Sequence, residues 1–388
     1  MKDILFICNG IALVDESKLG MSGGDARLFE IMRRTTGFRK SILVAFYGDK
    51  ILEQSGMKYY KKYVINYRVD SEIKSNAIIC FKSLFQFPKG LSSFSGIVYS
   101  SCEHLYDILP ALRLKIFNKC EWHAVYHWVE EYPWKDKRGG TPFLNRYLYW
   151  LNRYFSGLLI KLFADKILAV SETTKEKLIA IKGISPNRIK PVYCGVDYKK
   201  IVKIAEKYKK EKGSAYDAVY MKRLSAGKGA FDLLKIWKSV CLTNKDAKLA
   251  VIGNGSESVV KELNSFIVKN NLENNIKLLG SIYNFEEKFR VLNSSKMFIL
   301  PTYEENWAIV IGEAMAINLP VICYELKEIT PIWKDNILWV KVGDTNNFAR
   351  EIVNLLKNEH KRHGMALNAS DFITQYDWDQ IAKNEFSD

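Results

Sequence analysis

Two carboxylates, Glu305 and Glu313, have the types and spacing in this chain that most directly suggest chemistry. Pro301 closes the short apolar segment Met297–Leu300, which is typical of a buried strand, and Glu313 lies in a segment typical of a helix. The pattern therefore predicts a strand, an acidic loop and a helix. In open α/β folds, ligands bind at the carboxyl ends of parallel strands, where such loops lie.

A helix that begins just after Glu305 would present free backbone N–H groups and the positive end of its dipole. We expect the N–H groups of Trp307, Ala308, Ile309 and Val310 to bind a phosphate there. Because an ionised carboxylate only accepts hydrogen bonds, the two glutamates beside such a phosphate suit hydroxyl-rich groups such as ribose or another sugar.

A basic loop follows the strand-like segment 218–221 and contains Arg223, Gly227, Lys228 and Gly229. Arg223 can donate two parallel N–H bonds to a diphosphate, and Lys228 adds a point charge. The glycines allow the backbone to approach an anion closely. The alternative interpretation is a loop with two surface charges.

These motifs resemble those of the retaining glycosyltransferases of the GT-B fold, family 4 (glycosyltransferase group 1). Glu305 and Glu313 match the family's glutamate-x7-glutamate signature. The basic loop matches the family's Arg-Leu-x-x-x-Lys-Gly motif at Arg223, Leu224, Lys228 and Gly229. The chain departs from the family at Lys222, where glycine is usual, and in the acidic loop, where Asn306 and Ala308 replace common glycines.

The resemblance implies a role for each matched residue. Glu305 would contact the transferred sugar, Glu313 would hold the ribose, and Arg223 and Lys228 would stabilise the leaving diphosphate. No Asp-x-Asp metal motif follows any strand-like segment. We therefore expect no metal and no cofactor, with a UDP- or GDP-linked sugar as the donor substrate.

Further matches to the family are looser. Gly253 begins a Gly-x-Gly turn, and Ile282 lies in the segment on which the family rests its nucleobase. In the first half of the chain, Gly23 and Gly24 resemble the glycine-rich loop that meets the donor phosphate, and His127 falls where the family has a histidine near the reacting sugar. The alternatives are a tight turn, ordinary loop glycines and a structural histidine.

Strand-like and helix-like segments alternate along the 388 residues, which predicts parallel sheets flanked by helices. The expected strands are 4–8, 41–46, 97–100, 123–126, 166–170 and 189–193, then 218–221, 249–252, 276–279, 297–300 and 321–323. We predict an α/β protein of two Rossmann-like doubly wound domains facing a cleft, as in GT-B enzymes. The acceptor-binding domain would span 1–195 and the nucleotide-sugar-binding domain 196–370, with a terminal helix at about 371–388 packing back on the first domain.

Charge and aromatic residues favour an acidic surface as a partner. The formal net charge is +15, which attracts polyanions in general. Three segments combine basic and aromatic residues, namely Lys58–Tyr63, Phe81–Lys89 and Phe143–Phe163. They favour peripheral contact with a membrane, although partly buried elements with charged edges are the alternative. No nucleic-acid-reading module is recognisable, so nucleic acid is not expected as a partner.

Cysteine usage and hydropathy favour a cytoplasmic protein. The seven cysteines are scattered and several lie in apolar segments, which is typical of reduced core cysteines in an intracellular protein. The apolar segment Ile4–Cys8 ends at Asn9-Gly10 and is interpreted as a first strand rather than a signal. No apolar segment reaches the roughly 18–20 residues that span a bilayer. We expect a cytoplasmic protein, peripheral on the inner membrane face.

The sequence therefore predicts a retaining, metal-independent hexosyltransferase that acts on a glycan or lipid-linked acceptor. The alternatives are a GT-B sugar-nucleotide epimerase, a phosphorylase, and a catalytically silent scaffold that binds a nucleotide-sugar. A redox Rossmann protein is disfavoured, because no strand-like segment leads into Gly-x-Gly-x-x-Gly with an acidic residue after the next strand.

Overall fold

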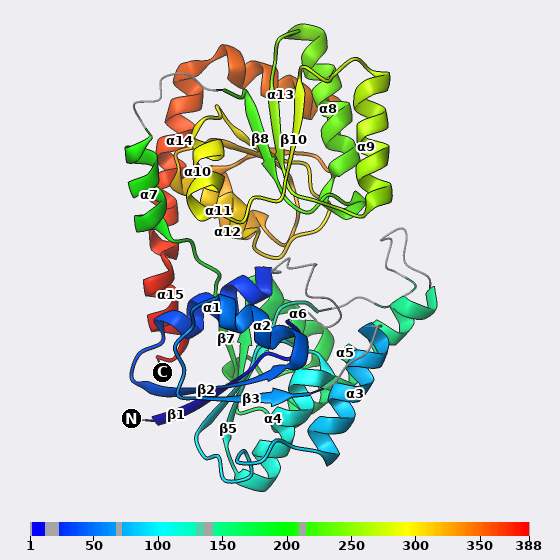
Figure 1. Ribbon diagram of the computed structural model, residues 1–388. Coiled ribbons are helices and arrows are strands. Elements are labelled where there is room, and N and C mark those ends of the chain that lie inside the picture. The colour runs from blue at the N-terminus through cyan, green and yellow to red at the C-terminus, as the bar shows by residue number, and fades with distance from the viewer. Residues whose placement is uncertain are drawn as a thin grey trace. The chain divides into compact units, whose positions relative to one another are not determined.

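The computed structural model describes residues 2–11, 23–66, 72–129, 132, 134, 143–208 and 215–387. The chain divides into two compact units. The N-terminal unit comprises Met1–Cys194 and Trp378–Asp388, and the C-terminal unit comprises Gly195–Asp377. Each unit contains a parallel sheet flanked by helices, so the predicted α/β class with two doubly wound units is confirmed (Figure 1).

In the N-terminal unit, a seven-stranded parallel sheet has the order β3-β2-β1-β4-β5-β6-β7. Its strands are β1 (Lys2–Ile7), β2 (Phe38–Ala45), β3 (Lys61–Ile65), β4 (Ile97–Ser100), β5 (Glu121–Tyr126), β6 (Lys166–Ala169) and β7 (Ile189–Pro191). Its helices are α1 (Gly23–Arg34), α2 (Phe46–Gln54), α3 (Glu72–Phe85), α4 (Leu105–Asn118), α5 (Phe143–Phe163), α6 (Glu172–Lys182) and α15 (Trp378–Glu385). The order reverses between β1 and β4, which makes the sheet doubly wound.

Helices cover this sheet because its strands are apolar on both faces, as in most parallel sheets. Right-handed crossovers place the helices that lead from β1 toward β3 on one face and those that lead from β3 toward β7 on the other. One buried core joins the strands to Ile79 of α3, Leu114 of α4, Ile160 of α5 and Leu178 of α6. None of the described helices has the length and apolar character needed to cross a bilayer.

In the C-terminal unit, a six-stranded parallel sheet has the order β10-β9-β8-β11-β12-β13. Its strands are β8 (Ala218–Met221), β9 (Leu249–Ile252), β10 (Ile276–Gly280), β11 (Phe298–Leu300), β12 (Val321–Tyr324) and β13 (Leu338–Val340). Its helices are α7 (Tyr198–Lys207), α8 (Ala230–Thr243), α9 (Glu257–Lys269), α10 (Phe285–Asn293), α11 (Ile309–Ala316), α12 (Thr330–Trp333), α13 (Thr345–Lys357) and α14 (Glu359–Ile373). The order reverses between β8 and β11.

The terminal segment differs from the expected helix over 371–388. Residues 371–377 belong to the C-terminal unit, because α14 runs to Ile373 and the Tyr376 ring packs on those of Trp333 and Phe372. Only the short helix α15 belongs to the N-terminal unit, where it packs on α1. The buried Glu385 of α15 forms an ion pair there with the buried Arg27 of α1.

Two strands were missed by sequence reasoning. β3 covers half of the segment interpreted as the basic and aromatic patch Lys58–Tyr63. Its burial alternates, because it lies at the edge of the sheet with Lys61 exposed and Tyr63 buried. β13 lies at the edge of the other sheet and has only three residues. Short edge strands with mixed polarity give weak period-two patterns.

Candidate active site

The predicted phosphate-binding and acidic loops meet at the switch point of the C-terminal sheet. The basic loop follows β8 and the acidic loop follows β11, and these two strands are neighbours. On either side of this point the chain winds in opposite directions, so the loops diverge and leave room for a ligand at the carboxyl ends of the strands. The structure therefore brings Arg223, Lys228 and Glu305 to one place in the fold.

Glu305 is a buried carboxylate held between two lysines. Its side chain is 7% exposed, and its Oε1 lies 2.9 Å from Lys222 Nζ and 3.2 Å from Lys228 Nζ. Burial by itself would raise the pKa of this carboxyl, but the two ammonium groups more than offset that effect and hold the pKa below its ordinary value. Glu305 is therefore ionised at neutral pH. Lys222, which replaces the family's usual glycine, is a partner that the sequence did not predict.

Backbone contacts fix the two loops to each other. Lys228 Nζ donates to the carbonyl of Glu304 at 2.6 Å, and the N–H of Tyr303 donates to the carbonyl of Gly227 at 3.0 Å. Gly229 has a φ of +73°, and a Cβ added there would lie 1.7 Å from the carbonyl oxygen of Pro301. Only glycine allows this approach, so the motif glycine has a defined packing role.

The remaining residues of the donor side lie around the same edge of the sheet. Arg223 is exposed, and Ile282, in the loop after β10, is half-buried. Gly253 has a φ of +140°, its N–H donates to the carbonyl of Gly280 at 2.8 Å, and an added Cβ would lie 1.9 Å from the carbonyl oxygen of Lys222. The Gly253 turn therefore packs directly against the basic loop. The nucleobase and phosphate roles of these residues stay predictions.

The helix after the acidic loop begins at Ile309, two residues later than the expected start near Trp307. Ala308 precedes it with a φ of 59° and a ψ of 67°, a left-handed conformation that costs a residue other than glycine about 1–2 kcal/mol. Trp307 is buried, and Trp333 Nε1 donates to its carbonyl oxygen at 2.9 Å. This packing fixes the loop, so that the N–H groups of Ile309 and Val310 stand in the first turn of α11.

Glu313 lies in the second turn of α11 and is paired with a lysine from α10. Lys288 Nζ is 2.7 Å from Glu313 Oε1 and also lies over the ring of Phe289, at 4.6 Å from its centroid. The ion pair keeps the carboxylate oriented. The sequence did not predict Lys288, and the ribose-binding role of Glu313 stays a prediction.

In the N-terminal unit, the predicted residues Gly24 and His127 are neighbours. A Cβ on Gly24 would lie 3.3 Å from the His127 ring, so glycine lets the first turn of α1, which begins at Gly23, approach the histidine. His127 Nε2 lies 2.9 Å from the carbonyl oxygen of Ser101, which can only accept, so Nε2 carries the proton. Burial is the main cause that lowers the pKa of His127, which keeps the ring neutral at pH 7. Gly20, another residue of this glycine-rich segment, lies outside the described residues.

Sequence reasoning missed two buried acids, Glu103 beside His127 and Asp107 beside Ser101. Glu103 accepts from the His127 backbone N–H at 3.0 Å, and its carboxylate is 3.4 Å from Arg153. Asp107 accepts from the Asn9 N–H at 2.8 Å and from Ser101 Oγ at 2.8 Å, while burial raises the pKa of its carboxyl to about 7. The position of Glu103 just after a strand was the available signal.

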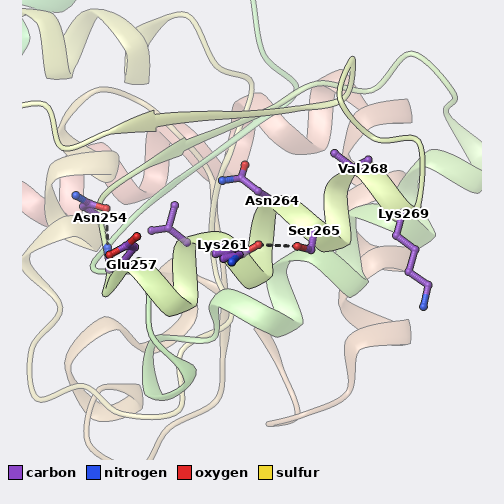
Figure 2. A pocket seen from close by; sticks show the side chains of 9 residues that line it. Asn254, Glu257, Lys261, Asn264, Ser265, Val268 and Lys269 are labelled. Atoms are coloured by element: carbon purple, nitrogen blue, oxygen red, sulfur yellow. Dashed lines mark hydrogen bonds between the residues drawn. The ribbon is translucent and has the colours of Figure 1, made fainter.

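A separate hollow of about 930 Å³ runs along α9. Its lining consists of Asn254, Gly255, Glu257, Val260, Lys261, Asn264, Ser265, Val268 and Lys269 (Figure 2). Apart from Asn254 and Gly255, these residues lie on α9, and none of the predicted site residues belongs to the lining. The hollow is open to solvent and contains no buried charge. We therefore place the candidate site at the switch point instead.

Two family profiles match the chain in succession. The profile of the glycosyl transferases group 1 matches residues 202–372, within the C-terminal unit, and that of glycosyltransferase family 4 matches residues 103–200. The chain belongs to the GT-B glycosyltransferases of family 4. The resemblance found in the sequence is thereby confirmed for the family and for the fold.

Two curated relatives in this glycosyltransferase family have names that point to glycan synthesis. The GPI3 subunit of phosphatidylinositol N-acetylglucosaminyltransferase from Saccharomyces cerevisiae is 24% identical over 246 residues, which is 60% of this chain and 52% of that protein. The capsular polysaccharide biosynthesis glycosyltransferase CapM of Staphylococcus aureus is 25% identical over 234 residues, which is 56% of this chain and 60% of that protein. The chain spans about half the length of the curated relatives it matches.

Solved structures agree with the GT-B fold over the whole chain. HepE of Anabaena, crystallised with UDP and glucose, has a TM-score of 0.74 at 17% identity and covers 99% of this chain and 98% of its own. Sucrose-phosphate synthase of Thermosynechococcus elongatus has a TM-score of 0.72 at 14% identity, with 99% and 97% covered. At such identities the similarity establishes the fold.

Proposed function

We propose that this protein transfers a sugar from a nucleotide-sugar to an acceptor hydroxyl with retention at the anomeric carbon. One observation carries the proposal, namely the ionised Glu305 held by Lys222 and Lys228 at the switch point of the C-terminal sheet. A buried carboxylate with a fixed orientation can accept hydrogen bonds from sugar hydroxyls. The spacing from Glu305 to Glu313, which is typical of the retaining family, supports the stereochemical part.

The donor diphosphate would bind beside this carboxylate. In this account Arg223 and Lys228 stabilise the leaving phosphates, and the N–H groups of Ile309 and Val310 add the positive end of the α11 dipole. Charge from the protein itself would replace a metal ion in this role, which is why we propose a metal-independent reaction without a cofactor. Gly23 and Gly24 would meet the donor phosphate from the N-terminal unit, where His127 would line the reacting face.

The nucleotide and the chemistry of proton transfer follow from the same site. Glu313 would bind the ribose hydroxyls, and the segment at Ile282 would contact a uracil or guanine base. HepE, a relative in fold, was crystallised with UDP, so we place UDP first and GDP second among the candidates. The leaving phosphate would itself accept the proton of the acceptor hydroxyl, and no protein base is assigned.

We further propose a lipid-linked or surface glycan as the acceptor, reached at the cytoplasmic face of a membrane. The support comes from the relatives, one named for a phosphatidylinositol substrate and the other for capsular polysaccharide. The acceptor would bind the N-terminal unit, and the protein would associate with the membrane peripherally.

Transfer assays with a panel of UDP- and GDP-sugars and polyprenyl-phosphate-linked acceptors test the proposal. Product linkage is read by NMR, and EDTA is included in one arm. We expect the sugar in the product to have the same anomeric configuration as in the donor, and the reaction to proceed in EDTA. Glu305→Gln should lower kcat by about 100-fold or more. Glu257→Gln, in the hollow along α9, is the matched control and should keep wild-type activity. Full activity of Glu305→Gln would contradict the assignment.

A further inference from the structure

The outer face of α5 carries a continuous apolar stripe that the site does not use. It consists of Leu144 (65% exposed), Leu148 (44%), Phe155 (48%), Leu158 (43%) and Leu162 (61%). These residues recur at three- and four-residue steps, with the half-buried Leu151 between them, so they follow one side of the helix. Contiguous exposed apolar surface of this kind marks an interaction site. These five residues are called the α5 stripe below.

The opposite face of α5 holds the helix in this orientation. Ser156 is fully buried, and its hydroxyl donates to the carbonyl of Glu103 at 2.5 Å. Arg153 lies 3.4 Å from the Glu103 carboxylate, and Ile160 belongs to the core of the N-terminal unit. A rotation that buried the stripe would break these contacts and expose Ile160. The stripe therefore stays exposed in the part of the N-terminal unit that the structure describes.

Aromatic residues of the kind found at membrane–water boundaries surround the first half of α5. The rings of Tyr147 and Tyr154 lie 5.9 Å and 5.3 Å from that of Trp150, and the rings of Tyr132 and Trp134 stack on each other beside it. Trp134 is 65% exposed. Tyrosine and tryptophan prefer the boundary because one end of each side chain is apolar and the other is polar.

The charge of this face is positive. α5 has no acidic residue. Of its three cations, Arg153 and Lys161 are held on the packed side by Glu103 and by the carbonyl of Lys182, and Arg146 lies over the exposed Phe143 ring at 5.8 Å from its centroid. α4 packs on α5, and α3 packs on α4 (Figure 1). These two helices add the exposed Phe85 and Phe117, and Arg113 of α4 lies over the Phe117 ring at 5.6 Å from its centroid. A helix with an apolar face, boundary aromatics and cations is typical of elements that lie in the headgroup layer of a bilayer.

We infer that the α5 stripe docks on an anionic lipid surface, with its leucine and phenylalanine side chains at the acyl boundary and Arg113 of α4 and Arg146 of α5 among the headgroups. The inference rests on the proposed function, because a lipid-linked acceptor would be presented at such a surface. A second copy of this chain fits less well. It would bring two faces of the same positive charge together in a protein of net charge +15, whereas anionic headgroups complement that charge.

Sedimentation with vesicles tests the inference. Wild-type protein is mixed with vesicles of phosphatidylcholine alone or with one third phosphatidylglycerol, at 0.1 and 0.5 M NaCl. We expect binding to the anionic vesicles that weakens at the higher salt and is much weaker for neutral vesicles. The double variant Leu148→Glu, Leu158→Glu should bind anionic vesicles at least about tenfold more weakly. Each leucine that is replaced removes part of the favourable free energy of transferring apolar surface from water into the bilayer.

The matched control places the same two substitutions at exposed leucines of the C-terminal unit, Leu242 (77% exposed) and Leu367 (49%). It has the same change in net charge and should bind vesicles as the wild type does. Equal binding by both double variants would overturn the α5 stripe as the docking surface. Equal binding to neutral vesicles would overturn the anionic partner. A wild-type dimer that the Leu148→Glu, Leu158→Glu variant dissociates would assign the stripe to self-association instead.

UDP and GDP binding, measured by thermal shift on the same variants, separates this inference from the proposed function. Both double variants should bind nucleotide as the wild type does, because their substitutions lie away from the donor residues. Vesicle binding without nucleotide binding would leave the docking surface standing and contradict the proposed donor. Nucleotide binding without vesicle binding would support the proposed donor and contradict the docking surface.

Discussion

The ion pair between Lys222 and Glu305 gives a prediction whose size follows from the structure. Lys222→Met removes an ammonium group that lies 2.9 Å from Glu305 Oε1 and whose side chain is 20% exposed. At an effective dielectric constant of about 20, two unit charges about 3 Å apart attract by roughly 5–6 kcal/mol. The variant no longer has to desolvate a lysine on folding, which offsets part of this loss, and Lys228 remains beside the carboxylate. We therefore expect a net loss of about 1–3 kcal/mol in the free energy of unfolding.

Thermal unfolding of the C-terminal unit measures this loss. For a unit of its size, about 1–3 kcal/mol corresponds to a fall in Tm of roughly 2–10 °C. The folded-state pKa of Glu305 is lowered, so its ion pairs contribute fully above the ordinary carboxyl pKa of 4.5 and lose their contribution as pH falls through the folded-state value. The difference between wild type and variant should therefore be full at pH 7 and shrink below pH 4.5.

Lys238→Met, at an exposed lysine of α8, is the control for the loss of one positive charge. It should change the Tm by less than about 1 °C, as is usual for substitutions at the surface. An equal fall in Tm for both variants would refute the reasoning. So would a difference for Lys222→Met that stays constant from pH 7 to well below pH 4.5, because it would then arise from packing rather than from charge.

Two further predictions concern the packing of each unit. Gly229→Ala should destabilise the C-terminal unit by more than about 3 kcal/mol, because the added Cβ would lie 1.7 Å from the carbonyl oxygen of Pro301. Its control, Gly364→Ala, adds a Cβ in open space within α14 and should stabilise the unit by about 0.5–1 kcal/mol. Equal stability of the two variants in urea unfolding would contradict this prediction. Glu385→Gln should destabilise the N-terminal unit by roughly 3–5 kcal/mol, because it leaves the buried Arg27 without its counter-charge. A change below about 1 kcal/mol in the same measurement would show that α15 is held mainly by its apolar contacts.

The sequence predicted those parts of the fold that depend on local patterns. The bounds of α5 match the basic and aromatic segment Phe143–Phe163, because its apolar residues repeat with the helical period. The central strands were predicted for a similar reason, since each is a short apolar segment buried on both faces. The edge strand β3 was missed because it begins with two consecutive lysines and buries only Tyr63 and Ile65.

The candidate site was predictable only where a motif supplied the residues. The spacing of Arg223, Lys228, Glu305 and Glu313 pointed to two candidate donor loops, and the sheet order places the first three residues together. The ion pair between Lys222 and Glu305 was not predictable, because it joins loops after two strands whose adjacency is a property of the fold. The carboxylate of Glu103 likewise reaches the backbone of His127 across neighbouring strands.

Nucleotide binding tests the central claim, a nucleoside diphosphate site at the switch point of the C-terminal sheet. Wild-type protein and Arg223→Ala are compared by thermal shift with UDP and GDP in EDTA. The account predicts that one of the two nucleotides stabilises the wild type by about 2.7 kcal/mol at a concentration 100 times its Kd, and that the shift is lost in Arg223→Ala. No shift with either nucleotide, or an equal shift in both proteins, would contradict it.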